Sequence, residues 1–505
     1  MEALDWLVIG VFFLALIGII VWVVRQKQND SADYFLGGRD ATWLAIGASI
    51  FASNIGSEHL IGLAGAGASS GMAMAHWEIQ GWMILILGWV FVPFYSRSMV
   101  YTMPEFLERR YNPQSRTILS VISLVSYVLT KVAVTVYAGG LVFQQVFGIK
   151  ELWGIDFFWI AAIGLVVLTA LYTIFGGMKS VLYTSVLQTP ILLLGSLIIL
   201  VLGFKELGGW DEMMRVCGAV TVNDYGDTMT NLIRSNDDAN FPWLGALIGS
   251  AIIGFWYWCT DQFIVQRVLS GKNEKEARRG TIFGAYLKLL PVFLFLIPGM
   301  IAFALHQKYI GAGGEGFLPM LANGTANADA AFPTLVAKLL PAGVKGLVVC
   351  GILAALMSSL ASLFNSSAML FTIDFYKRFR PETPEKKLVG IGQIATVVIV
   401  ILGILWIPIM RSVGDVLYTY LQDVQSVLAP GIAAAFLLGI CWKRTSAQGG
   451  MWGLIAGMII GLTRLGAKVY YSNAGEVADS TFKYLFYDMN WLFFCGWMFL
   501  FCIIV

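Results

Sequence analysis

Apolar runs long enough to cross a membrane recur along the whole chain. A spanning helix needs about 20 apolar residues, and the sequence contains thirteen such runs. They lie at 5–24, 42–67, 73–98, 115–148, 155–175, 181–204, 241–269, 280–307, 341–375, 387–411, 414–440, 447–465 and 487–505. The pattern predicts an all-α integral membrane protein with about thirteen transmembrane helices.

Basic residues gather in alternate loops between these runs. The loops rich in Lys and Arg fall within 25–39, 97–116, 267–279, 377–387 and 443–444. The loops poor in Lys and Arg are longer and fall at 205–240, 308–340 and 466–486. Because basic loops stay in the cytoplasm, we expect a multi-pass protein of the plasma (cell inner) membrane with its N-terminus outside.

Polar residues interrupt two of the predicted helices. The stretch "SNIGSEH" (53–59) divides one apolar run, and "CTDQ" (259–262) divides another. Broken helices at matching positions of two inverted repeats mark the midplane site of a secondary transporter. Alternatively, small residues there only let helices pack closely, which would account for the glycines but not for Asn54, Glu58 and His59.

Counting from each broken helix divides the chain into segments. Five spans occupy 42–204 and five more occupy 241–440, and the odd number inverts the second set relative to the first. We therefore expect two inverted repeats that form a transport core. The remaining segments, 1–30 and 441–505, would be peripheral helices, and because the sequence stops in an apolar run at Val505 we expect a truncation that removed a further helix.

The first interruption is suited to a small cation. Unwinding a helix in hydrocarbon costs several kcal/mol for each unpaired backbone group, and a hard cation that accepts carbonyl oxygens offsets this cost. The turn 52–55 can supply carbonyls, and Ser358 and Ser359 add hydroxyls from another apolar run. The alternative is that these serines bond only the carbonyls one turn back in their own helix.

Four further polar residues stand inside apolar runs: Glu78, Lys131, Lys288 and Gln422. A charge at mid-helix costs about 2.5–3.5 kcal/mol and marks a functional site by default, although Glu78 and Lys131 could instead snorkel from helix ends. Together the four offer donors and acceptors, as a neutral polyhydroxylated solute requires. Tyr257 and Trp258 would add apolar ring faces, and the absence of a predicted midplane arginine disfavours an anionic solute.

Composition excludes several other classes of protein. Hydrophobic residues make up 58% and charged residues 13% of the 505 residues, whereas soluble domains carry roughly 25% charge. The net charge of +2 and the lack of a basic tail give no sign of nucleic-acid binding. No nucleophile–base set and no His spacing for a metal enzyme occurs, so we expect no enzyme, and no obligatory protein partner is evident.

Several blocks of sequence are recognisable. They read "SEHLIGLAGAGASSG", "LGWVFVP", "YTMPEFLERRY", "FGGMKSVLYT", "WYWCTDQFIVQR", "YLKLLPVFLFLIPGM", "MSSLASLFNSSAMLFTIDFYK" and "AFLLGICWKR". In this order, over about residues 30–465, they resemble the sodium/solute symporter family and most of all its sodium/glucose cotransporter branch. The resemblance implies the inverted-repeat fold of the leucine transporter and sodium-driven uptake by alternating access.

The resemblance also implies two sites. It implies a sodium site made by the carbonyls of Ala52, Ile55 and Ala355 and the hydroxyls of Ser358 and Ser359. It implies a sugar site made by Asn54, His59, Glu78, Trp258, Lys288 and Gln422, with Tyr257 as the inner gate beneath the sugar.

Three positions depart from the family pattern. Members that use a second sodium share an acid after "YT", where this chain has Ser185, and an extra hydroxyl where this chain has Ala361. Gly254 lies where relatives often have a polar side chain, which puts one sugar contact in question. We therefore expect one sodium ion per solute.

The sequence thus predicts a sodium-coupled symporter that imports a neutral hexose resembling glucose or galactose across the lipid bilayer. One alternative keeps the fold and changes the solute to an inositol, another polyol or a nucleoside. A second alternative is a sugar-gated sensor or channel that binds the solute without accumulating it.

Overall fold

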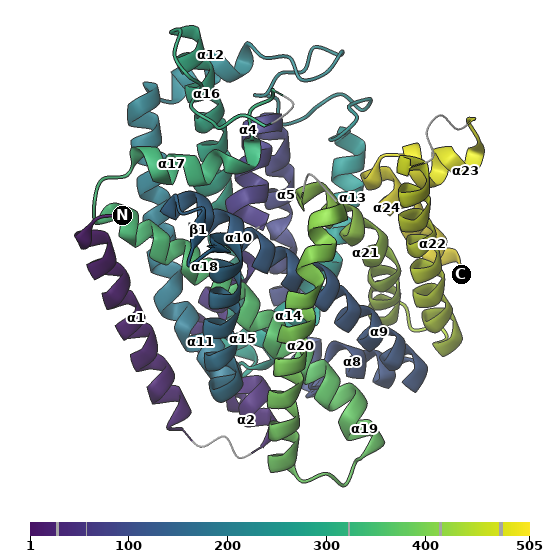
Figure 1. The fold of residues 1–505 in the computed structure, drawn as a ribbon. Coiled ribbons are helices and arrows are strands. Elements are labelled where there is room, and N and C mark those ends of the chain that lie inside the picture. Colours follow the sequence, from purple (N-terminus) through teal and green to yellow (C-terminus); the bar gives the residue numbers. More distant parts are fainter. Residues whose placement is uncertain (27–29, 57, 322–323, 414–416, 474–477) are drawn as a thin grey trace.

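The chain folds into a bundle of helices with one short β-hairpin (Figure 1). This computed structural model describes residues 1–26, 30–56, 58–321, 324–413, 417–473 and 478–505. The side chains at 129–130, 409–423 and 472–473 also lie outside the description. Short 3-10 and π-helical turns, labelled η, interrupt many of the helices.

The segment predicted as the first repeat begins with the broken helix α3 (Trp43–Asn54), η2 (Glu58–Leu63) and α4 (Ala64–Ser70). The next helix bends through η3 (Gly71–Met74), α5 (Ala75–Ile79), η4 (Gln80–Trp82), α6 (Met83–Ile86), η5 (Leu87–Phe91) and α7 (Val92–Ser98). There follow α8 (Met103–Arg110), α9 (Pro113–Ser126), η6 (Tyr127–Val132), α10 (Ala133–Phe147), the antiparallel strands β1 (Glu151–Leu152) and β2 (Ile155–Asp156), and α11 (Phe157–Leu207).

The segment predicted as the second repeat begins with a second broken helix, α13 (Trp243–Phe255), η7 (Trp256–Thr260) and α14 (Gln262–Leu269). It continues with α15 (Glu274–Leu287), η8 (Val292–Leu296), α16 (Ile297–Gly311), η9 (Ala328–Ala330) and α17 (Ala331–Leu339). The last elements are α18 (Val344–Met369), η10 (Leu370–Tyr376), α19 (Lys377–Phe379), α20 (Glu385–Val413) and α21 (Leu417–Cys441).

The remaining elements lie around this core. They are α1 (Ala3–Val24), α2 (Ser31–Leu36), η1 (Gly37–Arg39), α12 (Trp210–Gly218), α22 (Ala447–Asn473), α23 (Thr481–Lys483), η11 (Tyr484–Asp488) and α24 (Trp491–Ile504). Helix α1 lies on one side of the bundle and α22 and α24 lie on the opposite side (Figure 1). The basic loops near α2, α8 and α19 lie toward one end of the bundle, whereas α12, α17 and α23 lie toward the other (Figure 1).

Nine helical runs within the described residues are long and apolar enough to cross a membrane, and a pair bent by 110° at residues 481–504 would make ten. The predicted total of thirteen is larger because α3 and α10 are shorter apolar helices and because α11 joins two predicted spans. Gly177 divides α11 with a left-handed φ of 52°, which glycine adopts without steric cost. The total of thirteen stays a prediction.

Both predicted helix breaks are present. At the first break, Ile55 is extended (φ −78°, ψ 102°) after the last residue of α3. At the second, Asp261 is extended (φ −73°, ψ 127°) between η7 and α14. Helix α3 continues to Asn54, so the unwound part begins at Ile55 rather than at 52. Ala52 lies in the last helical turn, where carbonyls lack a helical donor.

Glycine brings the helices around the first break close together. A Cβ built on Gly67 of α4 would meet the backbone carbonyl of Leu296, and one built on Gly47 of α3 would lie 2.7 Å from the carbonyl of Gly280. Small residues at such crossings let backbones approach within a membrane. Close packing therefore accounts for these glycines, as the alternative reading expected, while the polar residues of the break have other contacts.

Candidate functional site

A small cavity lies between the two helix breaks. Its lining residues are Asn54, Glu58, His59, Trp77, Glu78, Gln80, Ile253, Tyr257, Trp258, Lys288 and Gln425. The volume of about 30 Å³ is close to the share of one water molecule. The site is therefore contracted in this conformation, and a sugar-sized solute requires the surrounding helices to move apart.

Three side chains from different helices form a buried charged triad at this cavity. Glu78 Oε2 lies 2.6 Å from Lys288 Nζ, and Glu78 Oε1 lies 3.3 Å from His59 Nε2. Lys288 Nζ also lies 2.7 Å from His59 Nε2. All three residues are at most 4% exposed, so Glu78 does not snorkel to a helix end. Opposite charges in contact offset the cost of burying them.

Two groups approach His59 Nε2, and the nearer one assigns the proton of the ring. Lys288 Nζ lies at 2.7 Å and Glu78 Oε1 at 3.3 Å. Because an ammonium can only donate, Nε2 accepts in the shorter contact and the proton of the neutral ring lies on Nδ1. That Nδ1 is buried and has no hydrogen-bond partner among the described residues. His59 thus keeps one free donor at the cavity.

Two amide oxygens around the same cavity are also unpartnered. Asn54 donates through Nδ2 to the hydroxyl of Tyr257 at 3.0 Å, but its Oδ1 has no partner in the described part of the chain. The Oε1 atom of Gln80 is likewise buried without a partner there. Buried polar groups in proteins are nearly always hydrogen-bonded, so one donor and two acceptors at one cavity indicate a ligand that supplies the missing bonds.

The residues implied for sodium meet at the first break. Ser359 Oγ of α18 donates to the carbonyl of Ser53 at 2.6 Å, and Ser358 Oγ lies 3.4 Å from Ser53 Oγ. Ser359 thus bonds across to the broken helix, contrary to the alternative that it bonds only its own helix; Ser362, one turn on, does bond the Ser358 carbonyl. The juxtaposition is present, whereas the full ligand set, with Ala52, Ile55 and Ala355, stays a prediction.

A buried arginine lies beside these serines, which the sequence reading did not foresee. Arg267 belongs to a basic loop segment, yet its side chain is 1% exposed and donates to Ser53 Oγ at 2.8 Å and to Ser49 Oγ at 3.1 Å. The guanidinium also lies 4.9 Å from the centre of the Phe263 ring. Its Nη1 has no partner, and no carboxylate lies within ion-pair distance of it, among the residues described.

The second break carries its own counter-charges. Lys131 Nζ donates to Asp261 Oδ2 at 2.7 Å, and the hydroxyl of Tyr127 donates to Asp261 Oδ1. The same Oδ1 accepts from the backbone of Phe263 at 3.2 Å and so caps α14. Lys131 also lies 4.7 Å from the Tyr257 ring centre. Lys131 is therefore buried in an ion pair beside Tyr257 rather than snorkelling.

The structure brings together most of the solute-site residues that the sequence predicts. Asn54, His59, Glu78, Tyr257, Trp258 and Lys288 all line the cavity. Gln422 lies outside the residues whose side chains are described. Their roles as solute contacts stay predictions.

Sequence reasoning did not assign five lining residues to the solute site: Glu58, Trp77, Gln80, Ile253 and Gln425. Of these, only Glu58 was singled out, as a polar residue of the first break. Gln425 could have been found, because it lies three residues after Gln422 and thus on the same helix face. Gln80 could also have been found as a second polar residue next to Glu78 in an apolar run. Trp77 and Ile253 carry no such signal, since apolar residues are ordinary in a spanning helix.

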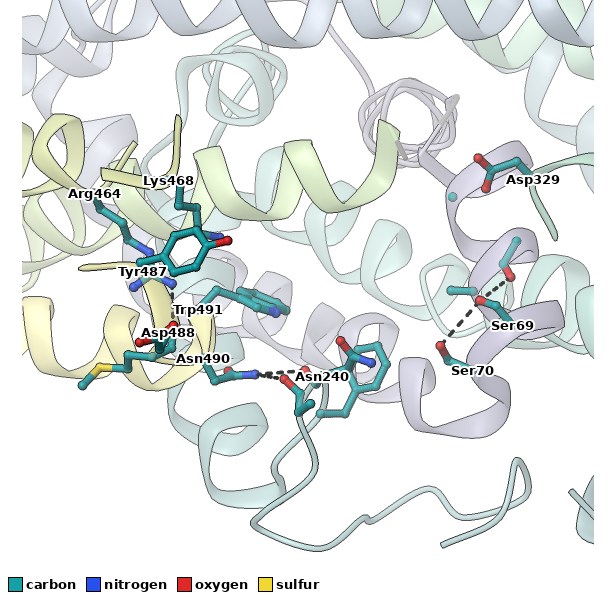
Figure 2. A pocket seen from close by; sticks show the side chains of 16 residues that line it. Ser69, Ser70, Asn240, Asp329, Arg464, Lys468, Tyr487, Asp488, Asn490 and Trp491 are labelled. Carbon is teal, nitrogen blue, oxygen red and sulfur yellow. Dashed lines mark hydrogen bonds between the residues drawn. The ribbon is translucent and has the colours of Figure 1, made fainter. Parts of the chain in front are cut away.

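A second cavity of about 400 Å³ opens on the side of α12 and α17. Figure 2 shows Asp329 and Ser69 across this cavity from Arg464, Tyr487 and Asp488. Trp491 of α24 lines it, and the Trp491 ring contacts the Trp77 ring edge-on with centres 5.6 Å apart. Trp77 lines the central cavity, so this aromatic pair connects the linings of the two cavities.

Relatives of known structure share the fold of the whole chain. One solved structure is a substrate-bound, outward-open Na⁺-coupled sialic acid symporter. The match spans 100% of this chain and 96% of that chain, with a TM-score of 0.80 and 22% identity. Mhp1, a nucleobase-cation-symport-1 family transporter in a closed conformation, covers 95% of this chain and 94% of its own at a TM-score of 0.53 and 13% identity. These likenesses assign the leucine-transporter type of fold.

Sequence relatives identify the family. Sodium/myo-inositol cotransporter 2 of Homo sapiens is 38% identical over 479 residues, which are 92% of this chain and 70% of that protein. Sodium/glucose cotransporter 2 of Rattus norvegicus is 38% identical over 512 residues, which are 97% of this chain and 75% of that protein. The sodium:solute symporter family matches residues 34–457. The chain therefore belongs to the sodium:solute symporter family and is a sodium-coupled membrane transporter rather than an enzyme.

Proposed function

We propose that this symporter imports a neutral cyclic polyol, and that its solute is a hexose resembling glucose or galactose. The observation that carries the proposal is the set of unpartnered atoms at the central cavity: Asn54 Oδ1, His59 Nδ1 and Gln80 Oε1. Ring hydroxyls both donate and accept, so one polyol can satisfy a donor and two acceptors together. Trp258 offers an apolar face to the ring C–H groups.

The charges at the cavity also favour a neutral solute over an anionic one. The positive charge of Lys288 is held by Glu78 at 2.6 Å, and Glu58 adds a further carboxylate to the lining. An anionic solute would have to displace Glu78 from Lys288 and approach Glu58. A polyol avoids both costs.

Sodium and solute would be coupled through the first broken helix. The carbonyl of Ser53 accepts from Ser359 on the sodium side, while the side chain of Asn54, one residue on, faces the solute cavity. A ligand at either place changes the conformation that the other ligand meets, which is a coupling free energy between sites. We infer that sodium from outside stabilises the outward-open state, and that Tyr257 forms the inner gate.

We infer a ratio of one sodium ion per solute. A second sodium beside Ser185 would lie among neutral hydroxyls, since Ser185 Oγ is 3.3 Å from Ser358 Oγ and 3.4 Å from Ser49 Oγ. Without an added carboxylate, the desolvation of a second sodium is not offset.

The ratio has a measurable consequence. One charge crossing 100 mV yields about 2.3 kcal/mol, and a tenfold sodium gradient adds about 1.4 kcal/mol. One ion then supports accumulation by roughly 500-fold, and two ions would square this figure. Paired sodium and solute fluxes in proteoliposomes should give a ratio near one and a Hill coefficient near one. A ratio near two would overturn this part of the proposal.

Counterflow in proteoliposomes tests the choice of solute. Vesicles loaded with unlabelled hexose should accumulate labelled glucose or galactose in the presence of sodium, and much less in choline. Exchange of myo-inositol in preference to both hexoses would establish the second candidate, which the myo-inositol cotransporters among the relatives favour. Solute binding without uphill accumulation would establish a sensor or channel instead.

We also propose that the chain lies in the plasma membrane with its N-terminus outside. The basic loops by α2, α8 and α19 would then face the cytoplasm. The larger cavity beside Asp329 and Trp491 would face outward, so the solute would pass it before reaching the Trp77–Trp491 pair.

A further inference from the structure

Gln80 and Gly254 occupy facing positions at the edge of the central cavity. Gln80 begins the short turn η4, two residues after Glu78, and is 6% exposed. Gly254 is a buried residue near the end of α13. A Cβ built on Gly254 would lie 2.5 Å from Gln80 Oε1 and 3.3 Å from Met83 Cγ. The Gln80 amide therefore fills the space that any side chain at 254 would enter.

The Gln80 amide is buried at the cavity with an unmade hydrogen bond. Its Oε1 has no partner among the residues that the structure describes, and leaving a buried acceptor unpaired costs stability. Gly254 offers no side chain to meet it. Gln80 also lines the central cavity, so a solute bound there can supply the missing hydrogen bond.

We propose that Gln80 is a specificity-determining contact for one ring hydroxyl of the solute, and that Gly254 is required because it leaves room for this amide. The inference rests on the proposed polyol import and adds a residue to that site. Because an amide oxygen accepts and an amide nitrogen donates, Gln80 would select for a hydroxyl at one ring position. A solute that lacks this hydroxyl leaves the acceptor unpaired.

A panel of singly deoxygenated hexoses tests the contact. In Gln80→Ala, the half-saturating concentration of the parent hexose should rise roughly ten- to hundredfold. One deoxy analogue should be transported equally well by the wild type and the variant, because both lack the same hydrogen bond. The matched control is Gln188→Ala: Gln188 is also a buried glutamine with unpartnered amide atoms, but it lies on α11 away from the cavity lining. Gln188→Ala should leave the analogue pattern unchanged.

Substitutions at both positions test whether Gly254 leaves room for the Gln80 amide. Gly254→Asn should lose most solute uptake, because a Cβ at 254 would lie 2.5 Å from Gln80 Oε1 and so displace the flexible Gln80 amide from its place at the cavity. Adding Gln80→Ala to Gly254→Asn should restore uptake, since the asparagine can then enter the vacated space. Uniform loss for every analogue in Gln80→Ala, or no loss at all, would overturn the inference while wild-type uptake still stands. Absence of sodium-driven uptake in the wild type would instead refute the proposed function.

Discussion

The two broken helices have the same architecture but different surroundings. At the second break, Asp261 caps the following helix, accepts from Tyr127 and pairs with Lys131. At the first break, the groups that contact Ser53 within the described residues are hydroxyls of α18 and the guanidinium of Arg267. The second break is thus neutralised by an acid and a base of the chain, while we propose that the first takes up an added ion.

This difference separates two roles that a matching pair of breaks can take. A break that holds its own ion pair is stable without a ligand, and at the second break Lys131 of this pair lies 4.7 Å from the Tyr257 ring centre. A break that lacks its own counter-charge depends on an added ion, and only such a break couples an ion gradient to a conformational change. We therefore propose that sodium acts at the first break and that the second break supports a gate at Tyr257.

Removing the acid of the second break should have the largest effect. Asp261→Asn leaves Lys131 buried without a counter-charge, which costs about 3–5 kcal/mol. We expect a strongly lowered melting temperature in detergent and little protein in the membrane. Thermal unfolding of the purified variant measures this.

A second variant tests whether the pair, rather than the acid alone, is responsible. Lys131→Met added to Asp261→Asn removes both charges and should regain most of the lost stability, because a neutral pair of similar volume is often well tolerated. If Asp261→Asn is as stable as the wild type, the second break does not depend on its ion pair, and the comparison fails.

Removing one hydroxyl at the first break should disturb sodium use without unfolding the chain. Ser359→Ala keeps a good helix former but deletes a predicted sodium ligand, and a hydrogen-bonding group to a charge contributes about 1.5–3 kcal/mol. We expect the sodium concentration for half-maximal uptake to rise roughly ten- to a hundredfold. Sodium titration of solute uptake measures it.

Ser367→Ala is the matched control for this variant. Ser367 is a buried serine two turns further along α18, and its Oγ has no partner among the described residues. Its loss should leave the sodium dependence unchanged. Uphill uptake by Ser359→Ala at ordinary sodium concentrations would show that the assigned sodium site is wrong.

Both breaks could be predicted from the sequence because burying unpartnered polar residues in hydrocarbon costs free energy. This cost singled out Asn54, His59, Glu78 and Lys288, and the structure brings them to one cavity. Pairings could not be derived in the same way. Lys131 and Asp261 lie 130 residues apart in the chain, and nothing in their local sequence indicates that they meet.

For Arg267, the sequence indicated the wrong environment. Its position in a basic loop indicated a solvated cytoplasmic residue, yet the side chain turns into the core toward Ser49 and Ser53. Helical periodicity does not reveal how far a long side chain reaches. The exact total of spans was also beyond the sequence pattern, because short helices and kinks such as that at Gly177 decide how apolar runs are divided.

Substitutions of two glutamines of α21 test which of them contacts the solute in the cavity between the breaks. Gln425 lines this cavity, and Gln422 lies one helical turn earlier. Gln422→Ala would leave a solute hydroxyl partly unpaired at a cost of about 1–3 kcal/mol. We expect the solute affinity to fall roughly ten- to a hundredfold, with sodium binding little changed. Unaltered affinity in Gln422→Ala, with a loss in Gln425→Ala, would assign the contact to Gln425.

The smallest expected effect concerns Asp329, which lies beside α4 of the first broken helix. Asp329 Oδ1 would lie 2.7 Å from a Cβ built on Gly65 of α4, and burial raises the pKa of this carboxyl from 3.8 to about 6. The unfolded chain therefore loses its proton first as the pH rises. The contribution of Asp329 to the free energy of unfolding is therefore greatest below pH 3.8. It is lost as the pH rises through about 6.

Asp329→Asn should remove this pH dependence. Because the carboxyl borders the larger cavity (Figure 2), water screens part of the penalty, and we expect a change of about 1 kcal/mol. Melting temperatures in detergent between pH 4 and 7 should fall less steeply with rising pH in the variant than in the wild type. The loop acid before the second broken helix, Asp238, instead accepts from the backbone N–H groups of Phe241 at 2.7 Å and Asn240 at 2.9 Å. An unchanged slope in Asp329→Asn would mean that the α4 end of the first broken helix does not owe its pH dependence to this carboxyl.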